Sequence, residues 1–275
     1  SDEGMDAIDR YMRGFAELAV KNHRGFVMDT PTWRASPKWA AELGVDRGQL
    51  KAIHREVVAK LVMLRDQHET PSSPFVVNGV IGPQSDGYAP SEIMTEFEAE
   101  AYHQTQVKWF AEMGADMVSA ITMTYADEAI GIVRAAKLAG IPSVISFTVE
   151  TDGCLPSGQT LGAAIEQVDA ATDGAAAYFM INCAHPDHFL HVLEQGGDWI
   201  GRIRGLRANA SRLSHAELDE AEELDDGNPE EFGQLHQQLG RLLPNLSVIG
   251  GCCGTDHRHV DHVCRADRSI TPVPA

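Results

Sequence analysis

Two adjacent cysteines carry the clearest chemical signal in this sequence. Cys252 and Cys253 follow an apolar run, and glycines stand on both sides of the pair. Neighbouring cysteines are poor disulfide partners, because the ring that closes across one peptide bond strains the backbone. Both thiolates can instead turn toward one soft metal ion, and glycine supplies the positive φ angles that this requires at no steric cost. The pair therefore predicts two ligands of a metal site.

Cys183 offers a third ligand, because it ends another apolar run at residues 176–183. Three thiolates suit Zn²⁺ and leave the open fourth position of a catalytic site. Each cysteine taken alone is better explained as a small buried side chain. Taken together, Cys183, Cys252 and Cys253 predict one zinc ion per chain. Cys154 and Cys264 fall in a loop and in a terminal helix, where no metal role is expected.

Seven short β-rich runs, separated by helical patterns, must position these cysteines. The strands are expected at residues 25–30, 75–81, 116–124, 143–149, 176–183, 202–209 and 246–251. The helices are expected at residues 5–21, 47–67, 91–113, 127–139, 161–169, 186–195 and 229–243, with a last one from about 256. Near-continuous apolar strands of this kind are buried on both faces, as in parallel sheets.

This alternation predicts a (β/α)₈ barrel of the TIM type, in which the loops after the strands build the active site. A doubly wound open sheet is the alternative, but it would bring the cysteines together less readily. Seven strands are one short of eight and the chain opens on a helix, so the first strand is expected to be the missing one. Residues 1–265 are expected to form a single barrel domain, and residues 266–275 a C-terminal tail.

Composition narrows the classes of function. The 275 residues carry 40 acidic and 22 basic side chains, a net charge of −18. This charge argues against binding to nucleic acid or to an anionic membrane, both of which require basic patches. No run of 18 apolar residues is present and no signal peptide is visible. Five irregularly spaced cysteines do not suggest a disulfide framework, so a reducing cytoplasm is the expected compartment.

Residues 182–183 and 250–255 resemble the two zinc-binding motifs of the homocysteine S-methyltransferase family, a zinc-dependent (β/α)₈ barrel. Residues 30–36, 79–83, 146–148 and 155–158 resemble further motifs of this family, and the resemblance extends over about residues 5–265. It implies transfer of a methyl group from a sulfonium or similar donor to the thiol of homocysteine, giving methionine. The expected partners are homocysteine and a small methyl donor, with the homocysteine thiolate at the open position of the zinc ion.

Six residues at strand ends are expected to bind substrate: Trp33, Arg34, Thr122, Glu150, Asn182 and Asn209. A guanidinium such as that of Arg34 holds a carboxylate well, and Glu150 could hold the ammonium group of the amino acid. An exposed loop carboxylate explains Glu150 equally well.

The sequence also departs from the family pattern. The D-G-G-x-G-T motif of the family's first strand is absent, Ile121 stands where the family has an acid, and Arg212 replaces another acid. Two alternatives therefore stay open, a methyltransferase for another small thiol and a zinc-binding barrel without turnover. A separate histidine cluster, His257, His259 and His262, is expected on a solvated last helix.

Overall fold

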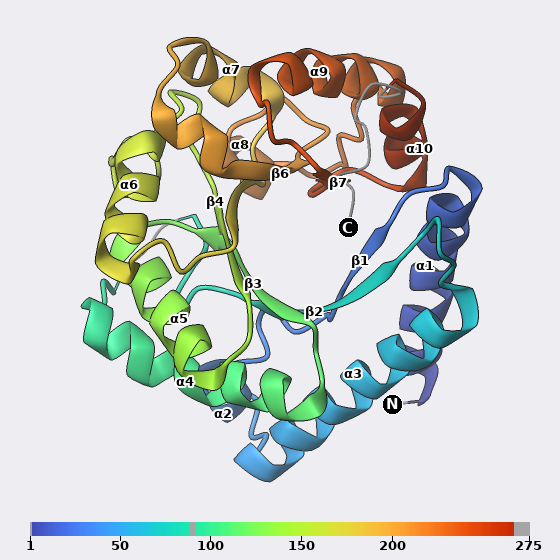
Figure 1. Cartoon of the computed structure of the whole chain (residues 1–275), viewed down its shortest axis with the longest axis vertical. Helices are drawn as coiled ribbons and strands as arrows, with labels where there is room; N and C mark the ends of the chain where they lie inside the picture. Colours follow the sequence, from blue (N-terminus) through green and yellow to red (C-terminus); the bar gives the residue numbers. More distant parts are fainter. Residues whose placement is uncertain (1, 89–91, 267–275) are drawn as a thin grey trace.

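Seven parallel strands form one curved sheet in which neighbours in space are also neighbours in sequence (Figure 1). The structure is a computed structural model and describes residues 2–88 and 92–266. The strands are β1 (Phe26–Asp29), β2 (Phe75–Ile81), β3 (Met117–Met123), β4 (Ser143–Phe147), β5 (Tyr178–Asn182), β6 (Ile203–Ala208) and β7 (Val248–Gly251). This sequential order confirms the barrel-type α/β fold and excludes the doubly wound sheet, whose strand order reverses at a switch point.

The sheet stays open on one side in the described part of the chain. Pairing runs from β1 to β7 and does not continue from β7 back to β1. A polar chain nevertheless joins β6 to β1, since Arg207 forms an ion pair with Asp29. Asp29 also accepts a hydrogen bond of 2.7 Å from Asn78, which in turn accepts one of 3.0 Å from Ser119. Residues 2–88 and 92–266 contain seven strands of this sheet, and that the barrel's first strand is the missing one stays a prediction.

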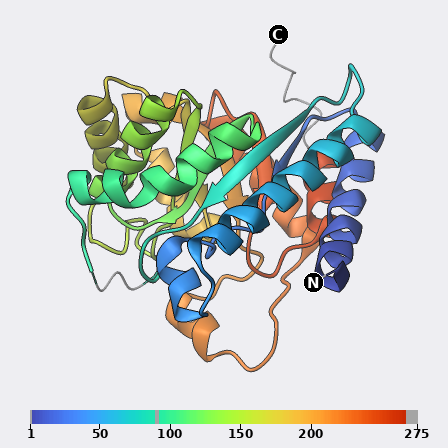
Figure 2. The same ribbon diagram turned by 90° about the horizontal axis from the view of Figure 1, so that it is seen from below.

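Helices cover the outer face of the sheet, as Figure 1 shows. They are α1 (Asp2–Lys21), α2 (Pro37–Glu42), α3 (Arg47–His68), α4 (Glu96–Met113), α5 (Ala126–Ala139), α6 (Leu161–Thr172), α7 (Pro186–Glu194), α8 (His215–Glu220), α9 (Pro229–Leu242) and α10 (His257–Ala266), with a 3₁₀ helix at Asp198–Arg202. The short helices α2 and α8 follow β1 and β6 and lie at the same end of the molecule (Figure 2).

Most element boundaries follow from local signals. The helix expected from residue 91 begins at Glu96, because Thr95 and Glu98 form a capping box that defines its first turn. It ends at Met113, and the next residue, Gly114, adopts the left-handed conformation typical of a helix C-terminus. The short helices α2 and α8 and the 3₁₀ turn were not expected, since each is too short to show a periodic pattern. Residues 267–275 of the predicted tail lie outside the described residues.

The core lies between the sheet and its helices, and the strands β2 to β5 are almost wholly buried. Phe110 of α4 and the stacked rings of Phe147 and Phe179 are among its largest fully buried side chains. Within residues 2–88 and 92–266, no helix combines the length and the apolar character needed to cross a membrane.

Buried His236 of α9 makes stability depend on pH. Its Nδ1 lies 2.8 Å from the Phe232 carbonyl oxygen, and burial lowers its pKa from 6.5 to about 4. Between pH 6.5 and about 4 the unfolded chain therefore binds a proton that the folded chain does not. The contribution of neutral His236 to the free energy of unfolding is complete above pH 6.5. As the pH falls from 6.5 to about 4, this free energy decreases by about 3 kcal/mol at most.

Replacement of His236 by asparagine, whose amide can still donate to this carbonyl, should reduce the loss of stability between pH 7.5 and pH 5. Urea unfolding of reduced, metal-free protein measures the free energy at both pH values without interference from metal release. His23→Asn, at an exposed position, is the control and should retain the wild-type pH dependence. An unchanged slope in the His236 variant would show that other groups cause it.

Candidate metal centre

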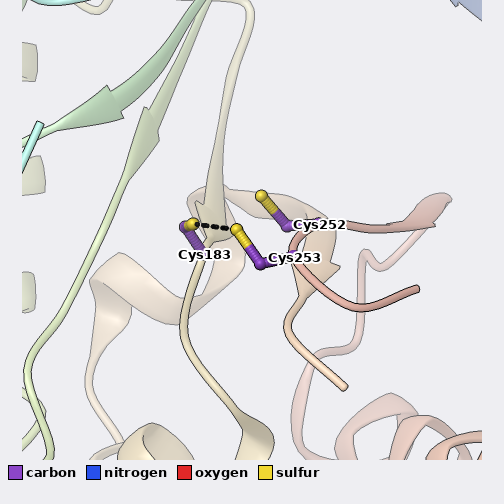
Figure 3. Close-up of side chains that lie close together, drawn as sticks. All are labelled: Cys183, Cys252 and Cys253. Atoms are coloured by element: carbon purple, nitrogen blue, oxygen red, sulfur yellow. Dashed lines mark hydrogen bonds between the residues drawn. The ribbon is translucent and has the colours of Figure 1, made fainter. Parts of the chain in front are cut away.

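Three cysteine sulfur atoms meet where two strands end, as Figure 3 shows. Cys183 directly follows β5, and Cys252 and Cys253 directly follow β7. The three Sγ atoms all lie within 4.8 Å of one another, and those of Cys183 and Cys253 are 3.4 Å apart. The structure therefore brings together the three residues that the sequence singles out.

The spacing of these sulfur atoms fits a tetrahedral zinc ion. Zn–S bonds of about 2.3 Å place two thiolate ligands of a tetrahedron about 3.8 Å apart. The 3.4 Å separation of Cys183 and Cys253 and the 4.8 Å limit on the whole set bracket this value, so small side-chain rotations suffice. Cys183 is buried, Cys252 is half-buried and Cys253 is exposed, so one side of the cluster is open to an incoming ligand.

Cys183 has a backbone conformation that is unusual for its residue type. Its φ of 55° lies in the left-handed region, which costs a non-glycine residue about 1–3 kcal/mol. Its N–H donates to the Arg207 carbonyl oxygen of the neighbouring strand end at 3.0 Å. Such strain persists where surrounding contacts enforce it, and here it accompanies a side chain directed at the other two sulfur atoms (Figure 3).

The Cys252–Cys253 turn is held by the end of β6. The N–H of Cys252 donates to the Ala208 carbonyl oxygen at 2.8 Å, and that of Cys253 donates to Oδ1 of Asn209 at 3.1 Å. Ala210 N–H then donates to the Cys253 carbonyl oxygen at 3.0 Å. Asn209, predicted to bind substrate, is almost fully buried, and its side chain positions the backbone of Cys253 in this structure.

The flanking glycines are required by space and by backbone angle. A Cβ on Gly251 would lie 2.0 Å from Oγ1 of Thr255. Gly254 has a φ of +76°, and a Cβ there would lie 2.5 Å from the Asp225 carbonyl oxygen. The glycines thus permit the tight turn that presents two adjacent cysteines on the same side.

The three thiols interact strongly. Hydrogen bonds from Cys183 and Cys252 lower the pKa of Cys253 to about 2. The same contacts with Cys252 and Cys253, together with burial, raise the pKa of Cys183. One negative charge is thus stabilised by all three sulfur atoms, while the buried thiol keeps its proton. A bound cation would offset the charge of three thiolates at this spacing.

Glu150 is linked to the cysteine cluster by His215, a residue that the sequence did not single out. Its Oε1 is 3.2 Å from Nδ1 of His215, and Nε2 of that ring is 2.6 Å from the Cys183 carbonyl oxygen. His215 begins α8, far from the cysteines in sequence, so no local motif indicated it. The Tyr88 ring packs on His215, with 4.2 Å between ring centroids.

Asn182 and Thr122, both predicted to bind substrate, bind each other in the structure. Oδ1 of Asn182 accepts hydrogen bonds from Thr122 N–H at 3.0 Å and from the Ser146 hydroxyl at 2.6 Å. Its Nδ2 donates to Oγ1 of Thr122 at 2.8 Å. Asn182 thereby ties the ends of β3, β4 and β5 together just before Cys183.

Trp33 and Arg34 lie on the loop after β1. Nε1 of Trp33 donates to the Ile121 carbonyl oxygen at 2.9 Å, so the indole bridges two strand ends. The Arg34 guanidinium lies 5.1 Å from the Trp33 ring centroid and 4.8 Å from that of Trp39. It is 3.8 Å from an Asp86 carboxylate oxygen and remains half-exposed.

The expectation that the last helix exposes its histidines to solvent is wrong for His259. This side chain is 0% exposed. Its Nε2 lies 2.8 Å from the Asp226 carbonyl oxygen and its Nδ1 lies 3.2 Å from the Asp256 carboxylate. His259 therefore connects the loop before α9, at Asp226, to Asp256 in the segment that follows the cysteine pair.

Asn209→Ala should weaken metal binding more than folding. The variant loses the acceptor for Cys253 N–H, and partners that orient ligands contribute about 10- to 100-fold to metal affinity. Zinc competition with a chromogenic chelator should show a loss in this range, with a loss of folding free energy of roughly 1 kcal/mol. Wild-type zinc affinity in a folded variant would contradict this role.

The sequence matches the homocysteine S-methyltransferase family over residues 5–266. Among solved structures, the metallated form of the homocysteine methyltransferase MmuM from Escherichia coli matches with a TM-score of 0.69 at 18% identity, covering 93% of this chain and 84% of that chain. The oxidized form of the same protein matches with a TM-score of 0.66 at 19% identity, covering 92% and 84%.

None of the curated protein sequences compared with the chain matches it. The structural likeness, at such low identity, shows the fold alone. The family match also establishes membership of the family, because it spans almost the whole chain and includes all three clustered cysteines. The chain belongs to the homocysteine S-methyltransferase family.

Proposed function

We propose that this protein transfers a methyl group from a small cationic donor to the thiol of homocysteine, giving methionine, and that it uses one zinc ion. The observation that carries the proposal is the cluster of three sulfur atoms within 4.8 Å, open on the side of Cys253. Three protein ligands with one open position are typical of catalytic zinc, whereas structural sites are closed by four.

The proposed zinc site would supply the thiolate nucleophile that this reaction needs at neutral pH. A free thiol has a pKa of about 8.5 and is mostly protonated at pH 7. Zinc bound to the three cysteines would hold the homocysteine sulfur as a thiolate. That sulfur would form a bond to the methyl carbon as the bond between this carbon and the donor's cationic atom breaks. The donor leaves as a neutral thioether or amine, and no covalent bond to the protein is needed.

The chain's own residues would bind and orient the acceptor. The Glu150 carboxylate is 37% exposed beside His215, so it has room to bind the ammonium group of homocysteine. The Arg34 guanidinium is half-exposed, so it would bind the carboxylate of the amino acid. Positioning of this kind lowers the barrier by fixing the thiolate in line with the methyl group.

Reduced, zinc-loaded protein should contain about one zinc per chain and should form methionine from homocysteine. Mass spectrometry of products would be run with S-methylmethionine, S-adenosylmethionine and betaine as donors, and with cysteine as a control acceptor. Methylation of cysteine but not homocysteine would favour a different thiol substrate. Stoichiometric zinc without turnover for any donor would favour a binding protein, and absence of zinc would refute the proposed centre.

A further inference from the structure

Tyr88 contacts the sulfur cluster from a loop that the family motifs did not single out. Its hydroxyl oxygen lies 2.8 Å from Sγ of Cys183. Its ring packs on His215 with centroids 4.2 Å apart. The phenol therefore stands between the buried sulfur and the His215–Glu150 pair, with its hydroxyl group directed at the sulfur.

The backbone just before Tyr88 is firmly seated. Tyr88 N–H donates to the Asp86 carboxylate at 2.8 Å. A Cβ on Gly87 would lie 3.1 Å from the Trp33 ring and 3.2 Å from the Thr122 methyl group. Gly87 thus rests against the indole and against a residue that is itself bonded to Asn182. Trp33 and Thr122, both predicted to contact substrate, thus pack against the residue before Tyr88 in this structure and help to hold Tyr88 near the cysteines.

The segment that connects β2 to α4 is hydrogen-bonded to the start of α5 near both of its ends. Gln84 N–H donates to the Glu128 carboxylate at 2.7 Å, and Met94 N–H donates to the Tyr125 hydroxyl at 3.1 Å. Glu128 is 1% exposed and its carboxylate lies 2.9 Å from Nε2 of His103. Hydrogen bonds to a buried carboxylate with two partners are strong. They hold Gln84 in place, and this restricts the position of Tyr88 four residues later.

We propose that Tyr88 is a positioning residue of the metal centre, whose hydroxyl donates a hydrogen bond to the Cys183 thiolate. The inference rests on the proposed zinc function. Cys183 is the ligand whose backbone is strained and whose sulfur is buried, so it depends most on a partner that holds its side chain. The hydrogen bond also withdraws charge from this sulfur, which adjusts how strongly it donates to the metal.

Tyr88→Phe removes the hydroxyl and keeps the ring that packs on His215. Zinc affinity, measured by chelator competition, should fall about 10- to 100-fold, the range for partners of metal ligands. In cobalt-substituted protein, the thiolate-to-cobalt charge-transfer band should move to longer wavelength, because a thiolate without this hydrogen bond gives up an electron more easily.

Tyr102→Phe is the matched control. It removes a tyrosine hydroxyl that donates to Ser36 at 2.8 Å, and it should leave the cobalt spectrum and zinc affinity unchanged. A Tyr88→Phe protein with the wild-type cobalt band and the wild-type zinc affinity would overturn the inference. Wild-type protein that binds cobalt but methylates no thiol would refute the proposed reaction alone, since the spectrum still tests Tyr88. Wild-type protein that binds neither zinc nor cobalt would overturn both.

Discussion

Cys252→Ala is expected to abolish both zinc binding and methionine formation. The variant keeps two of the three proposed ligands, Cys183 and Cys253, whose Sγ atoms lie 3.4 Å apart. Two thiolates leave a metal ion with half of a tetrahedral site, so affinity should fall on the order of 10³-fold or more. Methionine formation should fall by a similar factor, because the acceptor thiol would stay protonated near neutral pH. Elemental analysis after gel filtration and a product assay measure the two losses on the same sample.

Cys154→Ala serves as the control, since Cys154 lies in the loop after β4 and is no member of the cluster. It should retain about one zinc per chain and wild-type activity. Without metal, the free energy of unfolding of Cys252→Ala should lie within roughly 1 kcal/mol of the wild-type value, because Cys252 is only half-buried. A variant that loses activity but keeps zinc would show that Cys252 acts in some way other than as a ligand.

The arrangement of the strands could be predicted from the sequence because the signals are local. Each buried strand is a short apolar run, and each is followed by polar or glycine residues. Parallel strands joined by helices place their C-terminal ends on one side, so cysteines at two strand ends had to lie on the same side of the barrel. The 3.4 Å contact between Cys183 and Cys253 follows from that topology together with the glycine turn.

The residues around the cysteines could not be predicted in the same way. Tyr88 and His215 reach the cluster through long connections after β2 and β6, and their positions depend on tertiary contacts such as Gln84 with Glu128. His259 resembled a surface histidine, because its burial depends on a loop 33 residues away in sequence. Asn182 and Asn209 were predicted by motif to bind substrate, but a motif does not reveal which groups a side chain contacts.

Asn182→Ala should destabilise the protein strongly, even without metal or substrate. Asn182 is 0% exposed, and its side chain accepts from Thr122 N–H and the Ser146 hydroxyl and donates to the Thr122 hydroxyl. Truncation leaves these buried groups without their partner, at about 1–3 kcal/mol for each unsatisfied group. Partial rearrangement should limit the total to about 3 kcal/mol, measured by urea unfolding of metal-free protein. Asn245→Ala removes an exposed hydrogen bond to the Gly201 carbonyl and should cost at most about 0.5 kcal/mol.

Homocysteine binding separates the structural role of Asn182 from the predicted substrate role. A ligand that binds only the folded state raises the free energy of unfolding by an amount set by its affinity. If Asn182 acts by tying β3, β4 and β5 together, zinc-loaded wild type and variant should gain the same stabilisation from saturating homocysteine once both are fully metallated. A smaller gain in the variant would assign Asn182 a direct contact with the amino acid. Because every polar group of its side chain already has a partner inside the barrel, the equal gain is the expected result.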